Sequence, residues 1–173
     1  MKVKDIKQLI RDIPDFPTKG VIFKDITPLL KNYEAVKFVT RKIVNHFKNK
    51  NIQKIVSMES RGFMFGILAA QMLKCGFIPV RKKGKLPYKT ISVEYTLEYG
   101  TGILEMHEDA IENNENVLVI DDVLATGGTA NAVIELVKKC GGKVVGCGFL
   151  IELTFLHPEE KLKDVDIYSV IKY

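Results

Sequence analysis

The chain has 173 residues, of which 46% are hydrophobic, 27% are charged and 9% are aromatic. This length suits one domain with a sizeable core, and the composition excludes a chain that is mostly disordered. Lys and Arg outnumber Asp and Glu by 26 to 21, and only residues 81–85 form a dense basic cluster. A mixed, solvated surface therefore accounts for the net charge of +5 better than a nucleic-acid partner does.

No segment of the sequence is typical of export or membrane insertion. The longest nearly unbroken apolar stretch, residues 62–73, is too short to span a bilayer, and residues 1–7 lack the apolar run of a secretory signal. Cys75, Cys140 and Cys147 form no CxxC motif and are odd in number, which indicates reduced thiols rather than a disulfide framework or a zinc site. We expect a cytoplasmic protein with no membrane partner.

The first part of the chain predicts two helices separated by a loop. Apolar residues between positions 6 and 13 have helical spacing, and Pro14 and Pro17 end that helix. Residues 20–28 are expected to form a loop. Residues 33–48 have a second helical pattern with one apolar side.

From residue 54 onward, short apolar runs alternate with helical patterns. Strands that are apolar throughout and alternate with helices predict a mainly parallel sheet that is covered by helices on both faces. The expected helices follow the first and third strands, at about 63–74 and in the segment that Gly141 and Gly142 close. The expected strands are residues 55–58, 77–80, 117–120, 144–151 and 166–171.

Residues 90–107 break this alternation. Apolar and polar side chains alternate along residues 91–98, and Gly100 and Gly102 then turn the chain into a second apolar run. This period of two predicts a two-stranded hairpin inserted between core strands. Such an insertion is a candidate lid.

The strongest chemical signal is residues 117–129, VLVIDDVLATGGT. A buried strand delivers Asp121 and Asp122, and the loop and helix start that follow offer hydroxyls and unpaired N–H groups, which suit a phosphate monoester. The two carboxylates would repel a bare phosphate, so we expect them to face the hydroxyls of a phosphorylated sugar or a metal. The alternative is an ordinary strand-to-helix turn with a capping Asp. The loop residues are Ala125, Thr126, Gly127, Gly128 and Thr129.

This segment resembles the phosphoribosyl-pyrophosphate motif of purine phosphoribosyltransferases. Four further segments, in the same order along the chain, resemble the adenine-specific members of that family: residues 15–28 (DFPTKGVIFKDITP), 59–63 (ESRGF), 81–87 (RKKGKLP) and 97–100 (LEYG). The similarity extends from about Ile13 to the C-terminus.

The resemblance implies an α/β domain over residues 1–173 with the type I phosphoribosyltransferase fold, in which helices flank a mainly parallel central sheet. Residues 1–32 would form a small N-terminal hood that binds the base, and residues 84–107 would form an inserted β-hairpin lid. The implied reaction, a step of purine salvage, transfers the 5-phosphoribosyl group of phosphoribosyl pyrophosphate to adenine and yields AMP and pyrophosphate. Mg²⁺ would be held mainly by substrate and water, without a direct protein ligand.

The resemblance also assigns roles to individual residues. Asp121 and Asp122 would orient the ribose hydroxyls, and residues 125–129 would hold the 5′-phosphate. Glu98 would act as the acid–base group, with Tyr99 covering the site and Arg61 completing the catalytic set. The pyrophosphate group would be bound by Arg61, Arg81, Lys82 and Lys85. The adenine site would consist of Ile22, Phe23, Lys24 and Leu153.

The residues themselves support parts of these assignments. Arg61 and the basic cluster follow two strands, at the end where parallel sheets bind ligands. The resemblance further implies a homodimer in which Arg81 or its neighbours reach the site of the other subunit. Taken alone, Phe23 also fits a core aromatic, Glu98 a turn carboxylate, and residues 81–85 a solvated loop.

Three other functions stay open from the sequence. A transferase for hypoxanthine, guanine or xanthine is the main alternative among enzymes, and steady-state assays with each base would separate these activities. A non-enzymatic regulator that senses phosphoribosyl pyrophosphate would carry an added DNA-binding domain, and about thirteen residues before Pro14 leave no room for one. An RNA-binding module would use the basic cluster and would bind polynucleotide in a strongly salt-dependent way.

Overall fold

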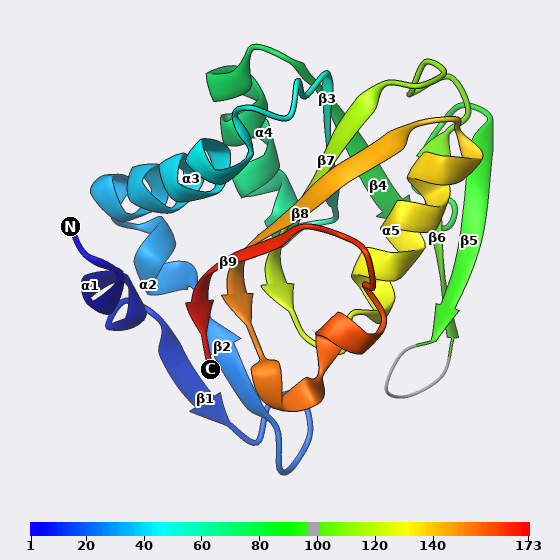
Figure 1. Cartoon of the computed structure of the whole chain (residues 1–173). Helices are drawn as coiled ribbons and strands as arrows, with labels where there is room; N and C mark the ends of the chain where they lie inside the picture. Colours follow the sequence, from blue (N-terminus) through cyan, green and yellow to red (C-terminus); the bar gives the residue numbers. More distant parts are fainter. Residues whose placement is uncertain (97–100) are drawn as a thin grey trace.

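A seven-stranded sheet runs through the centre of the computed structural model, which describes residues 1–96 and 101–173 (Figure 1). Its order is β5-β6-β4-β3-β7-β8-β9. Five neighbouring strands are parallel, as their apolar sequences predict. They are β3 (Lys54–Met58), β4 (Gly76–Lys82), β7 (Asn116–Leu124), β8 (Lys143–Glu152) and β9 (Ile167–Lys172).

Helices cover both faces of this sheet. Helices α3 (Tyr33–Phe47) and α4 (Arg61–Leu73) pack on one face, and α5 (Gly128–Lys139) packs on the other (Figure 1). Asn32 caps α3, because its side-chain oxygen accepts the N–H of Ala35 at 3.1 Å. The sheet therefore separates two apolar cores and confirms the predicted α/β layers.

The predicted hairpin is present, and it extends the sheet at one edge. Strands β5 (Thr90–Thr96) and β6 (Thr101–His107) are antiparallel to each other. Strand β6 is also antiparallel to β4, with Arg81 and Lys82 opposite Glu105 and Leu104. The hairpin is inserted between core strands in the sequence, but in space it adds two strands beyond β4.

The N-terminal segment differs from two of the sequence predictions. The expected helix over residues 6–13 is wrong, because α1 (Val3–Lys7) ends early and Ile13 lies in strand β1 (Arg11–Pro14). The expected loop over residues 20–28 is also wrong, because it contains strand β2 (Ile22–Asp25) and the start of helix α2 (Thr27–Leu30). Short apolar runs fit a helix or a strand by spacing alone, and here the pairing of β1 with β2 decides between them.

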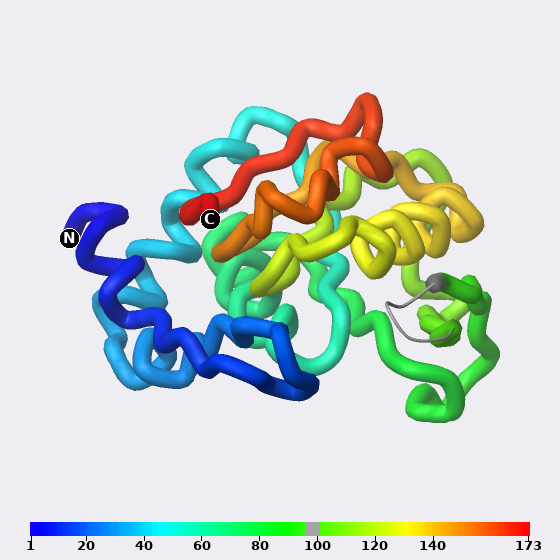
Figure 2. The backbone as a smooth tube through the Cα atoms, turned by 90° about the horizontal axis from the view of Figure 1, so that it is seen from below, coloured from blue at the N-terminus to red at the C-terminus, as the bar shows by residue number. Residues whose placement is uncertain are grey.

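Strands β1 and β2 form a separate two-stranded sheet beside the carboxyl end of β9 (Figures 1 and 2). The C-terminal residue Tyr173 touches this small sheet, since the Lys24 Nζ atom lies 4.0 Å from its ring centroid. After β8, two short 3₁₀ helices, Thr154–Leu156 and Pro158–Glu160, lead to β9. Within the two described ranges, none of the helices combines the length and apolar character that crossing a membrane requires.

Candidate active site

The carboxyl ends of β3 and β7 open into a cleft with a volume of about 810 Å³. Strand β2 and the segment before it form one wall, and the start of α5 forms another. Parallel sheets commonly bind ligands at this end of their strands. The cleft is lined by residues 20–24, 58–61 and 121–130, together with Phe149, Leu153, Phe155 and Leu156.

Two adjacent carboxylates lie on the floor of the cleft. The strand β7 continues through both, so Asp121 and Asp122 belong to the strand itself and not to the loop after it. Asp122 is buried, and its Oδ2 atom pairs with the Arg61 Nε atom at 2.9 Å. Burial raises the pKa of Asp122, and the Arg61 charge opposes that rise.

Asp121 is the more perturbed of the two. Desolvation, and secondly the charge of Asp122, raise the pKa of Asp121 well above its ordinary value. Its Oδ1 atom accepts the backbone N–H of Asp122 at 2.9 Å. Helix α4 approaches it closely at Gly62, where a Cβ atom would lie 2.6 Å from the Asp121 Oδ1 atom and 3.2 Å from the Ile120 carbonyl oxygen. A larger residue at position 62 would press against the Asp121 carboxylate and the backbone of β7.

The loop after β7 leads directly into helix α5. Gly127 is the N-cap residue, and its carbonyl accepts the N–H of Asn131 at 2.9 Å. The N–H groups of the first helical turn have no partner within a helix, and the helix dipole makes this end partially positive. Thr126 and Thr129 are half-buried in the same wall of the cleft. The loop therefore offers hydroxyls and N–H groups to an anion.

Another part of the cleft wall is aromatic. Phe23 in β2 is half-buried and meets Phe16 edge-on, with ring centroids 5.2 Å apart. The Arg61 guanidinium lies 4.9 Å from the Phe23 ring centroid. Arg61 thus contacts both the aromatic wall and Asp122.

The Lys24 side chain contacts other residues near the N-terminal hood, residues 1–32. Its Nζ atom donates a hydrogen bond to the Asp12 Oδ1 atom at 2.7 Å, across the paired strands β1 and β2, and lies over the Tyr173 ring. The Lys24 ammonium group therefore has its interaction partners in Asp12 and Tyr173. Lys24 and Ile22 also line the cleft.

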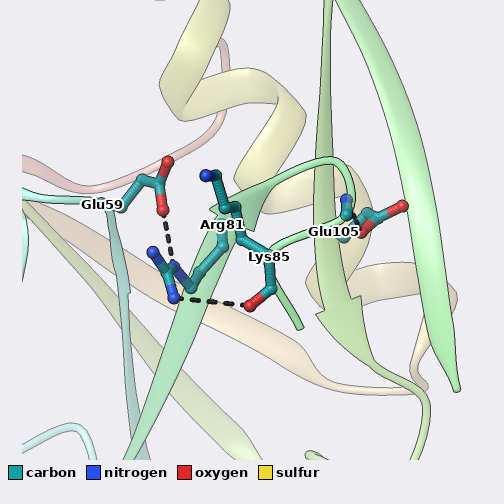
Figure 3. A network of polar contacts seen from close by, with 5 residues as sticks. Glu59, Arg81, Lys85 and Glu105 are labelled. Carbon is teal, nitrogen blue, oxygen red and sulfur yellow. Dashed lines mark hydrogen bonds and ion pairs between the residues drawn. The ribbon is translucent and has the colours of Figure 1, made fainter. Parts of the chain in front are cut away.

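The basic cluster lies beside the cleft and does not line it. The Arg81 Nε atom donates to the Glu59 Oε2 atom at 2.6 Å, and the Arg81 Nη1 atom reaches the Lys85 carbonyl at 3.4 Å (Figure 3). Lys82 and Lys85 are exposed. Of the four residues expected to bind pyrophosphate, the structure brings only Arg61 into the cleft of its own chain.

Comparison with known proteins identifies the family. The model of the phosphoribosyl transferase domain matches residues 24–172. The adenine phosphoribosyltransferase of Petrotoga mobilis is 57% identical over 173 residues, which cover all of both chains. The crystal structure of adenine phosphoribosyltransferase from Thermoanaerobacter pseudethanolicus has 48% identity and a TM-score of 0.97, with 99% of this chain and 100% of that chain covered. The chain belongs to the adenine phosphoribosyltransferase family.

A structure with a ligand supports the same family. The Giardia lamblia enzyme complexed with 9-deazaadenine is 39% identical, with a TM-score of 0.95 and coverage of 100% of this chain and 98% of that one. The type I phosphoribosyltransferase fold expected from the sequence is confirmed. The comparisons give no support to a transferase for another base, a regulator or an RNA-binding module.

Several residues of the cleft were not expected from the sequence. Glu59 accepts a hydrogen bond from Arg81. The position of Glu59 two residues before Arg61 was the sequence signal that could have marked it as a cleft residue. Phe149, Phe155 and Leu156 add apolar lining, and nothing in their sequence pattern sets them apart from core residues. Glu98 and Tyr99, the expected residues of the lid tip, lie outside the residues that the structure describes.

Proposed function

We propose that this cleft binds phosphoribosyl pyrophosphate and adenine together and transfers the 5-phosphoribosyl group to the base, giving AMP and pyrophosphate. The observation that carries this proposal is the position of Arg61, which contacts the aromatic wall at Phe23 and the carboxylate of Asp122. One side chain thereby joins the proposed base site to the proposed sugar site. The α5 loop, residues 125–129, lines the same cleft.

The 5′-phosphate fits the start of α5. The hydroxyls of Thr126 and Thr129 and the N–H groups of residues 127–129 donate hydrogen bonds to its oxygens, and the helix dipole favours its charge. Asp121 and Asp122 accept hydrogen bonds from the ribose hydroxyls. Burial raises the pKa of both carboxyl groups, and hydrogen bonds donated by the ribose hydroxyls would offset the cost of burying their charge.

Adenine stacks on Phe23, with Leu153 on its other side and the backbone of Ile22 and Lys24 at its edge. A ring nitrogen of adenine attacks the anomeric carbon of the sugar while the bond to pyrophosphate breaks. The transition state resembles an oxocarbenium ion, which the carboxylates stabilise and the closed cleft protects from water. The proton of the ring nitrogen passes to Glu98, and Tyr99 covers the site.

Pyrophosphate would lie next to Arg61. Arg81 is tied to Glu59 in its own chain, and Lys82 and Lys85 do not line that chain's cleft, so we infer that this cluster serves the cleft of a second copy in a homodimer. The outer side of α4 supports a second copy, since the apolar side chains of Ile67 and Met72 are 52% and 44% exposed. Sedimentation analysis of the purified chain tests the dimer.

Mg²⁺ fits this cleft as a substrate-held ion. Within the described ranges, no three His, Cys, Asp or Glu side chains come together in a way that suits a metal ion. Pyrophosphate oxygens, ribose hydroxyls and water would supply its oxygen ligands, with Asp121 and Asp122 holding the hydroxyls in place. When bound, the ion neutralises charge on the leaving pyrophosphate. Cytoplasmic location and the absence of nucleic-acid and membrane partners stay predictions.

Release of pyrophosphate with different bases tests the proposed function. Adenine should be used at least about 10⁴-fold more efficiently than hypoxanthine. A six-oxo purine presents an acceptor to the backbone groups of the hood that would accept a hydrogen bond from the amino group of adenine. Guanine and xanthine serve as further comparisons, and a reaction without base measures background hydrolysis. Comparable efficiency with hypoxanthine would contradict the assignment of adenine.

A further inference from the structure

Glu105 is a buried carboxylate outside the cleft, next to the basic cluster. It lies in β6, opposite Arg81 of β4 and Ser92 of β5, and only 8% of its surface is exposed. Its Oε2 atom accepts the backbone N–H of Gly84 at 2.9 Å (Figure 3). Arg81 pairs with Glu59 instead, so Glu105 is directed at the turn after β4.

A buried glutamate at this position in a strand lowers the stability of the fold unless its carboxylate is compensated. Burying a carboxylate is unfavourable unless hydrogen bonds compensate it, and β-branched residues suit half-buried strands better. Here the carboxylate holds a turn that carries four cationic side chains within residues 81–85 and whose like charges repel one another. We therefore assign the contact to the conformation of the turn and not to the packing of the core.

The turn itself has few other ties. Gly84 has φ of +76°, a left-handed conformation that side chains other than hydrogen disfavour. The N–H of Lys83 bonds to the Ile103 carbonyl at 3.1 Å, and the N–H of Lys85 bonds to the Lys82 carbonyl at 3.3 Å. At the tip of the turn, the Gly84 N–H depends on Glu105.

We propose that Glu105 is a positioning residue for pyrophosphate. By holding Gly84, it fixes the turn in the conformation that presents the ammonium groups of Lys82 and Lys85 to the pyrophosphate of phosphoribosyl pyrophosphate. This role rests on the proposed function of the basic cluster.

The substitution Glu105→Ala tests this role, with Glu105→Gln as the conservative variant. The alanine variant should raise the KM for phosphoribosyl pyrophosphate, and for pyrophosphate in the reverse reaction, by about tenfold or more, since a hydrogen bond to a charged group is lost. The KM values for adenine and AMP should change less than about twofold, because the turn lies away from the base site. Glutamine retains an acceptor oxygen for the Gly84 N–H and should restore most of the affinity.

A matched control is available at the other end of the sheet. Glu115 is equally buried, at 8% exposed, and its Oε2 atom accepts the N–H of Glu112 at 2.9 Å just before β7 begins. Glu115→Ala should lower the Tm and leave all four KM values unchanged. It therefore measures what the loss of a buried carboxylate does to the fold alone.

Gly84→Ala provides a second route if Glu105→Ala fails to fold. A Cβ atom there meets nothing within 4 Å, so the substitution strains only the left-handed turn. It should raise the same two KM values, and combining it with Glu105→Ala should give less than the product of the separate effects, since both disturb one turn.

The outcomes separate the two proposals. If the parent chain forms no AMP, the proposed function is wrong. If the parent is active but Glu105→Ala changes the KM values for adenine and phosphoribosyl pyrophosphate equally, or changes neither, the positioning role is wrong. A glutamine variant as defective as the alanine variant would also overturn it.

Discussion

In the parallel strands, cleft residues lie at or just after the carboxyl ends, where β3 leads to Arg61 and β7 carries Asp121 and Asp122. Of the antiparallel pieces, strand β2 lines the cleft from a separate sheet. The hood pair β1–β2 stands as a separate sheet. The hairpin β5–β6 extends the central sheet at its edge, where Arg81 and Lys82 of β4 lie opposite Glu105 and Leu104 of β6.

The parallel and antiparallel strands therefore differ in how they hold the residues of the site. The parallel strands are covered on both faces, so the side chains at their ends are fixed by the fold. The antiparallel pieces differ from each other, since β1–β2 is a separate sheet whereas Val93, Tyr95, Leu104 and Met106 of the hairpin are buried in the core. We expect substitutions at the ends of the parallel strands to weaken sugar-phosphate binding. We expect substitutions in β1–β2 to affect base recognition, and substitutions in the hairpin to affect chemistry or pyrophosphate binding.

The largest expected effect lies in the parallel part. Replacing both Thr126 and Thr129 with Val should weaken binding of phosphoribosyl pyrophosphate by roughly 3–6 kcal/mol, because two charge-assisted hydrogen bonds of about 1.5–3 kcal/mol each are lost. Calorimetry on the folded variant measures this change. Thr40→Val is the control, because the Thr40 hydroxyl bonds to the Val36 carbonyl in α3, away from the cleft. Unchanged affinity in the double variant would remove both threonines from the site.

The next effect tests the hairpin. Glu98→Gln keeps the shape of the side chain but cannot accept a proton, so kcat should fall by roughly 10²–10⁴-fold with little change in phosphoribosyl-pyrophosphate affinity. Single-turnover product formation is the appropriate measurement, since slow product release would hide a chemical defect. Glu94→Gln in the same hairpin is exposed and should behave like the parent. A Glu98→Gln rate within about threefold of the parent would leave Glu98 without a catalytic role.

A stability measurement tests the parallel part in the absence of substrate. The pKa of Asp121 is raised in the folded chain, so the folded state binds its proton more tightly than the unfolded state, and stability is lost as the pH rises. Asp121→Asn should therefore raise the Tm at pH 7 and have less effect near pH 4, since each pKa unit is worth about 1.4 kcal/mol.

Asp166 provides a control of opposite sign for that measurement. Its side chain accepts hydrogen bonds from His46 and Lys50, which lower the pKa of the Asp166 carboxyl. The stability it contributes is present above its unfolded pKa and is lost as the pH falls, so Asp166→Asn should destabilise the chain most near neutral pH. Thermal unfolding in which both variants shift in the same direction would contradict the electrostatic assignment of Asp121.

The smallest expected effect concerns the hood. Lys24→Ala should cost about 1 kcal/mol of stability through the lost contacts with Asp12 and Tyr173. The KM for adenine should stay within about threefold of the parent, because the proposed contact uses the Lys24 backbone. Lys24→Arg should restore the stability. A tenfold rise in the adenine KM of Lys24→Ala, with phosphoribosyl-pyrophosphate affinity intact, would place the Lys24 side chain on the base.

The parallel part was also the part that sequence patterns predicted well. Continuous apolar runs flanked by helical patterns define β3, β7 and α5 within a few residues, and the position of Asp121 and Asp122 before a Thr- and Gly-containing loop places them at the cleft. Local signals suffice there because each cleft residue follows a strand directly.

The hood was predicted poorly for the opposite reason. Ile13 and Phe23 face each other only because β1 pairs with β2, and a short apolar run carries no mark of its distant partner. The same holds for Arg81, which looks like a ligand for an anion in sequence but is held by Glu59, 22 residues away. Glu105 alternates with apolar neighbours like any strand residue, and its contact with Gly84 depends on the pairing of β4 with β6.

The close approach at Gly62 limits how this site can be redesigned. Because any Cβ atom would press against the Asp121 carboxylate and the Ile120 carbonyl, a random substitution library should return glycine alone at position 62 among active variants. Its neighbour Phe63 meets Phe77 edge-on at 5.7 Å and is half-buried, so other large apolar residues should survive there. An engineer who wishes to move Arg61 toward a different leaving group must shift the whole start of α4, because the adjacent position leaves no room for adjustment.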